Sequence, residues 1–139
     1  MSVDFLDSNV FLYVFDRHDA RKRAIAKELI RDALHRGDTA ISHQVVQETL
    51  NVLTGKLKAA AGPDEARRFL HTVLVPFWRV MPSPELFQRG INVQERYGFH
   101  FYDALIVAAA LDAGCTRLLS EDLQHDQRIE TLIVENPFI

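Results

Sequence analysis

Four carboxylates occupy positions that an ordinary solvated surface does not explain. Asp7 and Asp122 each follow a short apolar segment that is predicted to be a strand. Glu48 has valines three residues before and four residues after it on a predicted helix, and Asp103 stands near the start of an apolar helix. An ionised carboxylate in apolar surroundings is costly unless it is paired, so these four acids are the first candidates for a functional site.

The residue types favour a hard divalent cation. Acids that gather at one end of a sheet repel one another and raise each other's pKa values, so such a group is expected chiefly around a bound cation. The chain has a single cysteine and no HExxH spacing, and oxygen ligands without sulfur select Mg²⁺ or Mn²⁺ over zinc. His100 and His125 lie near the acids in the sequence, and we interpret them as polar groups beside the site rather than as metal ligands.

Each acid also has a simpler structural interpretation. Asp7 could cap a helix, and Glu48 could be an exposed residue at the edge of an apolar stripe. Asp103 could be a first-turn partner of the helix dipole, and Asp122 could belong to a turn after a strand. Glu121 is adjacent to Asp122 and could share or replace its role. The dipole interpretation is weakest for Asp103, because its helix is apolar on every side.

The elements that position these acids alternate between strands and helices. Strands are predicted at residues 3–7, 40–41, 116–120 and 132–135, with an extended edge within 76–82. Helices are predicted over residues 10–15, 20–35, 42–61, from 63 onward, 84–97 and 101–113. Alternation of this kind with short links predicts one α/β domain, in which a parallel sheet is covered by helices on both faces.

Capping signals and apolar spacing define several of these elements. Ser42 and Ser83 are predicted N-caps, Pro63 is predicted to open a helix, and Gly98 is predicted to end one. On the helix after Ser42, the apolar positions that are expected to face the core are Val46, Leu50, Leu53 and Leu57. The single cysteine, Cys115, is predicted to be a buried small apolar residue.

Length and composition limit the class of protein. The 139 residues suit a single domain over residues 1–139, long enough to bury a core without a disulfide or a structural metal. The longest apolar run, residues 104–111, is far shorter than the roughly 20 residues of a membrane span, so no membrane partner is expected. The N-terminal residues lack the pattern of a signal peptide, and with the single cysteine this predicts a cytoplasmic protein.

The charges are unevenly distributed. Sixteen basic and nineteen acidic residues give a net charge of −3, which argues against a general nucleic-acid coat protein. Residues 17–68 hold eleven basic and seven acidic groups, a net of +4, while the remaining residues hold five and twelve, a net of −7. Setting aside the four candidate acids leaves fifteen acids against sixteen bases. The net charge therefore does not exclude a nucleic-acid substrate, because the acidity is concentrated at the predicted metal site.

Four segments together resemble the PIN-domain family and, within it, the VapC-type ribonuclease toxins of type II toxin–antitoxin pairs. They are Phe5-Leu6-Asp7-Ser8-Asn9, Gln47-Glu48, the run from Phe101 to Ala110, and the run from Leu119 to His125. Each segment is a weak signal on its own, but four in this order and spacing are a strong one. The resemblance covers residues 4 to about 135 and implies a three-layer α/β/α sandwich with a short, mostly parallel central sheet, forming a single PIN-like nuclease domain.

The resemblance also implies roles for individual residues. The four acids named above match the family's acids, which hold one or two Mg²⁺ or Mn²⁺ ions. The polar residues that are expected around them are Ser8, Asn9, Ser120 and Glu121. The chain departs from the family at Gln124, where many members carry another acid. Whether Glu121 or Asp126 replaces that acid is open at this point.

The implied activity is metal-dependent endonucleolytic cleavage of RNA. Under this hypothesis a metal held by Asp7 and Asp103 lowers the pKa of the attacking water, and a second metal toward Glu48 and Asp122 stabilises the leaving oxygen. The basic residues that could follow the RNA backbone are Arg21, Lys22, Arg23, Arg67 and Arg68. The family further implies a cognate antitoxin that blocks the acidic pocket, and a homodimer or a larger toxin–antitoxin assembly.

Two other functions are compatible with the same residues. A Mg²⁺-dependent phosphatase or phosphotransferase would use Asp7 as its nucleophile, although Asn9 stands where haloacid-dehalogenase-type enzymes carry a second aspartate. A catalytically silent RNA-binding or protein-binding module would keep the acids as a degenerate metal site. The sequence contains no GxGxxG, Walker or GxSxG motif that would point to another chemistry.

Overall fold

The computed structural model describes residues 2–55 and 61–139 of the chain. Across these residues, six strands form one sheet: β1 (Asp4–Leu6), β2 (Thr39–Ser42), β3 (Trp78–Val80), β4 (Arg117–Leu119), β5 (Arg128–Ile129) and β6 (Leu132–Glu135). Their order is β3-β2-β1-β4-β6-β5, and all neighbours run parallel except β5 and β6. The predicted mostly parallel sheet is confirmed, whereas β5 was not predicted because two residues carry no recognisable pattern.

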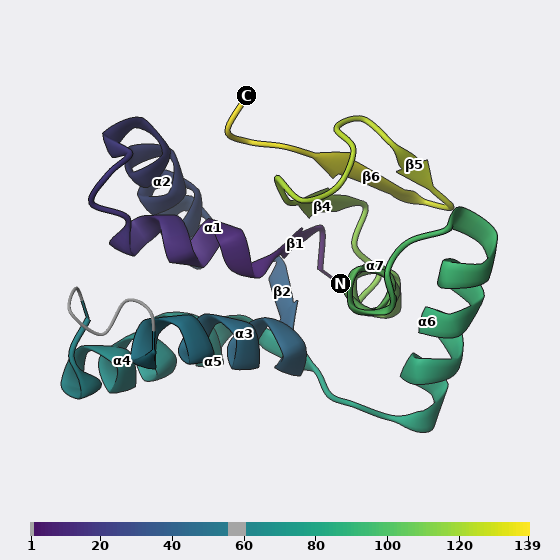
Figure 1. The fold of residues 1–139 in the computed structure, drawn as a ribbon, viewed down its shortest axis with the longest axis horizontal. Coiled ribbons are helices and arrows are strands. Elements are labelled where there is room, and N and C mark those ends of the chain that lie inside the picture. Colours follow the sequence, from purple (N-terminus) through teal and green to yellow (C-terminus); the bar gives the residue numbers. More distant parts are fainter. Residues whose placement is uncertain (1, 56–60) are drawn as a thin grey trace.

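Helices surround this sheet in space (Figure 1). They are α1 (Ser8–Leu12), α2 (Ala20–Arg36), α3 (His43–Thr54), α4 (Pro63–Phe69), α5 (Val75–Phe77), α6 (Pro84–Tyr97) and α7 (Phe101–Asp112). A 3₁₀ turn, η1 (Tyr13–Phe15), extends α1, and a π-helical segment, η2 (Leu70–Leu74), joins α4 to α5. Each helix predicted from the sequence is present.

The helix ends follow the predicted capping signals. Ser42 Oγ accepts a hydrogen bond from the backbone N–H of Val45 at 3.5 Å, and Ser83 Oγ accepts one from that of Leu86 at 3.1 Å. Gly98 ends α6 with a φ of 77°, a left-handed conformation that glycine adopts without strain.

One predicted boundary is wrong. The helix expected over residues 42–61 ends at Thr54, where Gly55 follows as the C-cap and donates its backbone N–H to Asn51 O. Leu57, a predicted core position on that helix, lies outside the described residues. The apolar spacing continued past the glycine, and the capping signal at Gly55 was the stronger one.

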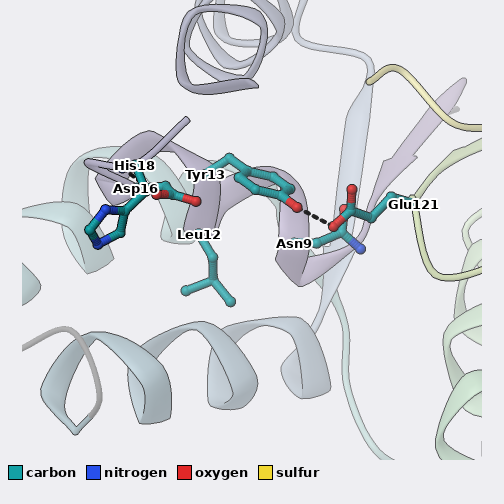
Figure 2. Close-up of a pocket in the computed structure, with 6 residues that line it drawn as sticks. All are labelled: Asn9, Leu12, Tyr13, Asp16, His18 and Glu121. Carbon is teal, nitrogen blue, oxygen red and sulfur yellow. Dashed lines mark hydrogen bonds between the residues drawn. The ribbon is translucent and has the colours of Figure 1, made fainter. Parts of the chain in front are cut away.

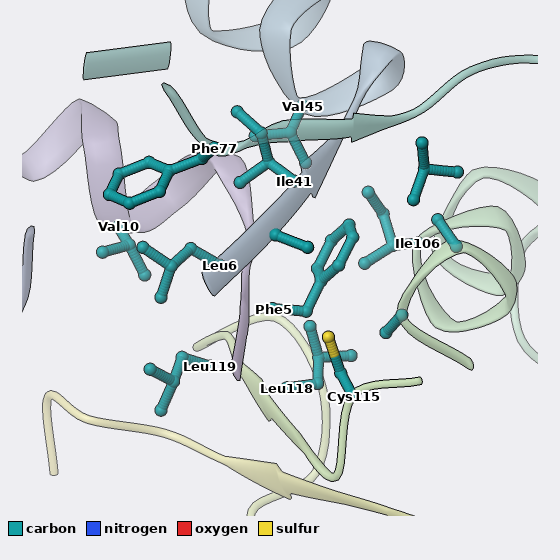
Figure 3. Close-up of a cluster of buried hydrophobic side chains, with 14 of the residues drawn as sticks. Phe5, Leu6, Val10, Ile41, Val45, Phe77, Ile106, Cys115, Leu118 and Leu119 are labelled. Atoms are coloured by element: carbon teal, nitrogen blue, oxygen red, sulfur yellow. The ribbon is translucent and has the colours of Figure 1, made fainter. Parts of the chain in front are cut away.

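Two apolar layers form the core, one on each face of the sheet (Figure 3). Successive residues of a strand point to opposite faces, so Phe5 packs toward Ile106 of α7, while Leu6 faces Val10 of α1. All four side chains are at most 2% exposed. Because β4 pairs with β1 in parallel register, it repeats the same alternation. The predicted cover on both faces of the sheet is confirmed.

Helix α7 is almost entirely buried, as its composition predicts. Residues 104–111 are all buried, and α6 packs closely against them. The close approach depends on Gly90 of α6, because a Cβ at that position would lie 2.7 Å from Leu105 Cδ2. Cys115 follows α7 and is buried as predicted, and burial raises the pKa of its thiol to about 12. No helix in the described ranges has both the length and the apolar character to cross a bilayer.

An ion pair with a buried aspartate joins β1 and β4 at the end of the sheet that lies away from Asp7. Asp4 is 3% exposed. Its carboxylate accepts hydrogen bonds from Arg117 Nε and Nη2 at 2.9 and 2.7 Å, and from Arg36 Nη2 at 3.0 Å. Arg117 Nη1 also donates to Glu135 Oε2 of β6 at 2.8 Å. A buried carboxylate is tolerated only when it is paired, so this network fixes the strands that carry the opposite end of the sheet.

Candidate active site

The carboxyl ends of β1 and β4 meet where the strand order changes direction. The chain passes from β1 to β2 and β3 on one side of β1, and then places β4 on the other side. Ligand sites of open parallel sheets lie outside the carboxyl ends of the strands at such a switch point. Asp7 follows β1, Ser120 follows β4, and Asp7 N donates to Leu119 O at 3.0 Å. The topology therefore places Asp7 and Ser120 where a ligand is expected.

Asp7 is a buried carboxylate with a raised pKa. Its side chain is 4% exposed, and it accepts hydrogen bonds from Ser8 N at 2.7 Å and from Ser120 Oγ at 2.8 Å. Burial raises the pKa of Asp7, these two hydrogen bonds lower it, and the charges of Asp122 and Glu48 raise it again. The resulting pKa is about 7. Asp7 is also the N-cap of α1, so the predicted structural interpretation is confirmed, and its functional role stays a prediction.

Ser120 connects Asp7 to Asp122. Its buried hydroxyl donates to Asp7 and accepts from the backbone N–H of Asp122 at 3.1 Å and from Asn9 Nδ2 at 3.3 Å. Asn9 Nδ2 also donates to Asp122 Oδ2 at 3.2 Å, whereas Asn9 Oδ1 is buried and has no hydrogen-bond partner among the described residues. A buried amide oxygen is normally satisfied, so this atom is an acceptor available to a water or an ion at the site.

Glu48 reaches the same place from α3. Ser8 Oγ donates to Glu48 Oε1 at 3.3 Å, and Gln44 Nε2 lies 3.5 Å from Glu48 Oε2. Burial raises the pKa of Glu48, these hydrogen bonds lower it, and the charges of Asp103 and Asp122 raise it again. Glu48 is therefore half-buried among polar groups, and its interpretation as an exposed residue at the edge of the stripe is wrong.

Asp103 enters the group from the first turn of α7. It is half-buried, and burial raises its pKa, with a further increase from the charge of Asp122 and a decrease from His100. No hydrogen bond to the Asp103 carboxylate is present within residues 2–55 and 61–139. The position in the first turn agrees with the dipole interpretation, but that interpretation does not explain why another acid lies within electrostatic range.

The structure thus brings the four predicted acids together at one edge of the sheet. The charge of Asp122 raises the pKa of each of the other three. All the ligand atoms that these acids offer to a metal are carboxylate oxygens, which Mg²⁺ and Mn²⁺ prefer. In the part of the chain that the structure describes, no three histidine, cysteine, aspartate or glutamate side chains are grouped so as to hold a metal ion. The donor chemistry fits a divalent cation, and the carboxylates would have to draw together around it.

Glu121 lies apart from the four acids. It accepts a hydrogen bond from the Tyr13 hydroxyl (Figure 2). It also forms an ion pair with Lys22, whose Nζ is 3.0 Å from Glu121 Oε2. Lys22 Nζ also contacts the Tyr13 hydroxyl at 3.1 Å, and its hydrogen bonds with Tyr13 and Glu121 raise the lysine pKa. Lys22 and Tyr13 therefore hold the Glu121 carboxylate, and a role for Glu121 shared with Asp122 stays a prediction.

The loop beyond Asp122 turns away from the acids. Gln124 and Asp126 are exposed, and neither forms a hydrogen bond or ion pair with the four acids within the described ranges. His125 Nδ1 accepts a hydrogen bond from Asn136 N at 3.0 Å, and its Nε2 lies 3.5 Å from Asp126 Oδ2. Replacement by Asp126 of the acid that is absent at Gln124 stays a prediction. Of the two histidines predicted to lie beside the site, only His100 acts on one of its acids.

The basic residues predicted to follow RNA are largely engaged within the chain. Arg21 donates to Phe138 O and Arg23 donates to Asp16 O, both at 2.8 Å. Lys22 is paired with Glu121, and Arg67 is paired with Asp64 at 2.8 Å. Arg68 is exposed on α4. Two of the five, Lys22 and Arg67, are therefore paired with acids, while Arg21, Arg23 and Arg68 keep a positive charge that no acid neutralises among the described residues.

A pocket of about 350 Å³ adjoins the acid group (Figure 2). Its lining residues are Asn9, Leu12, Tyr13, Asp16, His18 and Glu121. Asn9 belongs to both places, because its side chain bonds to Asp122 and also forms part of the pocket wall. The pocket has a mainly apolar lining and offers space for a flat group beside the carboxylates.

Fold and site together define the class of protein. An open, mostly parallel sheet whose switch point gathers four carboxylates is an α/β domain with an acidic ligand site. The family model of the PIN domain matches residues 5–129, which is most of the chain. The chain therefore belongs to the PIN-domain family. No curated protein sequence matches it.

Solved structures share this fold over nearly their whole length. A toxin–antitoxin complex from Klebsiella pneumoniae is 20% identical, covers 97% of this chain and 98% of its own, and has a TM-score of 0.72. VapBC2 from Rickettsia felis, bound to a fragment of promoter DNA, is 18% identical, covers 96% and 98%, and has a TM-score of 0.67. VapC20 from Mycobacterium tuberculosis, a toxin that cleaves the sarcin–ricin loop, is 21% identical, covers 86% and 91%, and has a TM-score of 0.62.

Proposed function

We propose that this chain is a Mg²⁺- or Mn²⁺-dependent endoribonuclease and the toxin of a toxin–antitoxin pair. The observation that carries the proposal is the gathering of Asp7, Glu48, Asp103 and Asp122 at the switch point of a PIN-domain sheet. Membership of the PIN-domain family supports nuclease chemistry. The structural neighbours support the toxin role, because they are described as toxins or toxin–antitoxin complexes.

Some residues of the site would hold the metal ion, and others hold those residues in position. The four acids would hold the ion or ions, which when bound would neutralise the carboxylates and lower the pKa of a water toward neutrality. Ser120 holds one oxygen of Asp7 in place, Ser8 holds one of Glu48, and Asn9 holds one of Asp122. These groups stand at the ends of strands and helices, so the site favours positioning and charge neutralisation over covalent catalysis.

RNA is the substrate that the surroundings of the site favour. Tyr102 precedes Asp103 on α7 and its side chain is 69% exposed, so its ring is available to an unstacked base. The pocket lined by Tyr13 and Leu12 lies on the other side of Asn9 and has room for a neighbouring nucleotide. Tyr102 and Tyr13 therefore offer aromatic rings to a single-stranded segment.

Cleavage of a fluorescently labelled single-stranded RNA tests the proposal. We expect cleavage in Mg²⁺ or Mn²⁺, none in EDTA, and a loss of at least about 100-fold in Asp7→Asn and Asp103→Asn, since each removes a charge that the ion requires. Asp64→Asn is the matched control, because Asp64 is an exposed carboxylate on α4, and it should cleave like the native chain. Thermal melting of each variant separates loss of activity from loss of folding.

Two results would contradict this assignment. Undiminished cleavage by Asp103→Asn would show that the acid group is not the active site. Formation of an acid-stable, base-labile phosphoryl adduct at Asp7 from a phosphate ester would instead identify the phosphotransferase with an aspartate nucleophile. Absence of both RNA cleavage and adduct formation in a folded chain would favour the silent binding module.

The toxin role has its own test in cells. Induced expression of the native chain should arrest growth, and Asp103→Asn should relieve the arrest while accumulating to the same level. The proposed antitoxin blocks the acidic pocket with a peptide that presents an arginine to the carboxylates, and the toxin itself forms a homodimer or a larger assembly with it. Co-expression of a protein that binds the native chain and restores growth would support that partnership, and equal growth with the native and Asp103→Asn chains would contradict the toxin role.

A further inference from the structure

Gln44 connects the helix that carries Glu48 to the helix that carries Asp103. Its side chain on α3 is buried, with 7% exposure. Gln44 Nε2 donates to Tyr102 O, in the first turn of α7, at 3.0 Å and lies 3.5 Å from Glu48 Oε2. Of the side-chain hydrogen bonds found among the described residues, this one alone runs from α3 to α7.

Packing alone does not account for an amide at this position. The next two residues of α3, Val45 and Val46, are buried and apolar, and an apolar residue at position 44 would avoid the loss of hydration that a buried amide suffers. The two N–H groups on Nε2 of Gln44 can serve two acceptors at once. One acceptor is a backbone oxygen of α7, and the other belongs to a candidate metal ligand.

The Tyr102 carbonyl oxygen, which accepts the hydrogen bond from Gln44, is held in place by its helix. It belongs to the peptide unit that leads into Asp103, in the first turn of a helix that is held by its buried residues. Glu48 is carried by a longer side chain that is only half-buried. The amide therefore ties the Glu48 carboxylate to the backbone that carries Asp103.

We infer that Gln44 is a positioning residue that holds Glu48 in register with Asp103 through its bond to the Tyr102 carbonyl. The inference rests on the proposed function and concerns a residue outside the set predicted from the sequence. Gln44 acts through Glu48 and does not touch the substrate. Its loss should therefore weaken metal binding and turnover, while the KM for RNA measured at saturating Mn²⁺ stays the same.

The test replaces Gln44 by methionine, which keeps the volume and removes the amide. Gln47→Met is the matched control, because Gln47 is exposed on the same helix. For Gln44→Met we expect an Mn²⁺ dissociation constant about 10-fold higher and a kcat about 10-fold lower, as is typical when a group that orients a ligand is removed. The melting temperature and KM should remain near those of the native chain, and Gln47→Met should leave all four quantities unchanged.

A double-mutant cycle with Glu48→Gln distinguishes positioning from general support of the fold. If Gln44 acts through Glu48, adding Gln44→Met to Glu48→Gln should change the Mn²⁺ affinity less than 2-fold, because both substitutions act on the same metal ligand. Additive losses in the double variant would overturn the inference, as would a Gln44→Met chain that matches Gln47→Met in Mn²⁺ affinity and kcat. Gln44→Leu repeats the comparison should the methionine variant fold poorly.

The same measurements separate this inference from the proposed function. A folded native chain that neither binds Mn²⁺ nor cleaves RNA contradicts the proposed function and the inference together. A native chain that does both, with Gln44→Met indistinguishable from the control, contradicts the inference alone.

Discussion

At the scale of single residues, burial decides how Asp7 titrates. The folded chain holds the pKa of this carboxyl at about 7, above its ordinary value of 3.8. Between these two values the folded state binds a proton that the unfolded state has released, so the contribution of Asp7 to stability falls as pH rises through this window. The contribution is most favourable below pH 3.8 and least favourable above pH 7.

Asp7→Asn should therefore stabilise the metal-free chain at alkaline pH. A shift from 3.8 to about 7 corresponds to a gain in the free energy of unfolding of up to about 4 kcal/mol at pH 8, which vanishes near pH 4. Urea denaturation in EDTA at the two pH values measures it. The same destabilisation at both pH values would contradict the buried-charge explanation. Saturating Mn²⁺ should raise the stability of the native chain and leave Asp7→Asn unchanged.

The exposed ring of Tyr102 gives a second prediction at this scale. Stacking of an unpaired base on an aromatic ring contributes about 1–3 kcal/mol, so Tyr102→Ala should weaken RNA binding by about 10-fold or more. Tyr102→Phe keeps the ring and should bind like the native chain. The melting temperature should change little in either variant, because the side chain is 69% exposed. Fluorescence anisotropy with labelled RNA and Ca²⁺ measures binding, and equal affinities of the alanine and phenylalanine variants would exclude stacking on Tyr102.

At the scale of elements, the sheet is tied together at the end opposite the site. Asp4 of β1 and Arg117 of β4 are register partners, and Arg117 also bonds to Glu135 of β6. Arg36, at the last position of α2, contacts the same Asp4 carboxylate. The network therefore spans three strands and a helix. Asp4 and Arg117 lie at the ends of β1 and β4 opposite to Asp7 and Ser120, whereas Glu135 lies at the carboxyl end of β6.

Arg117→Met should lower stability without altering the active site directly. The change removes two hydrogen bonds from a buried carboxylate, which Arg36 continues to neutralise in part. We expect a loss of about 1–3 kcal/mol in the free energy of unfolding, measured by urea denaturation. Arg67→Met is the control, because its ion pair with Asp64 is exposed and should be worth at most about 0.5 kcal/mol. Equal losses in both variants would contradict a special role for the buried pair.

At the scale of the whole molecule, net charge and site charge oppose RNA binding until a cation is present. The chain carries −3, the charge of Asp122 helps to raise the pKa values of Asp7, Glu48 and Asp103, and Lys22 and Arg67 are already paired with acids of the chain. Divalent cations at the acids would remove the repulsion that RNA phosphates meet there.

RNA affinity should therefore depend on the divalent ion itself. In Ca²⁺ we expect binding at least about 10-fold tighter than in EDTA at the same ionic strength, a difference of about 1.4 kcal/mol. Asp103→Asn should reduce this difference, while Asp64→Asn should leave it intact. Anisotropy titrations at constant ionic strength measure the effect, and identical affinities with and without Ca²⁺ would contradict metal-assisted RNA binding.

Much of this protein was predictable from local chemistry. The strand that leads into Asp7, the helix start at Ser42 and the helix end at Gly98 follow from the residues at those positions, because capping and apolar periodicity are local effects. The apolar run around Asp103 predicted a buried helix for the same reason. The sequence alone also identified the four acids, since a carboxylate in apolar surroundings is unusual wherever the chain folds it.

Tertiary structure decided how those residues relate to one another. Glu121 and Asp122 are neighbours in the sequence, yet Lys22 and Tyr13 hold the first while Asn9 and Ser120 contact the second. The pairing of Gln44 with Tyr102, like that of Asp4 with Arg117 and Arg36, joins residues far apart in the chain. Such pairings depend on strand order and on the approach of helices, which no local pattern encodes. The sequence by itself therefore determined which acids are candidates for the site, and only the folded chain decided which partners orient them.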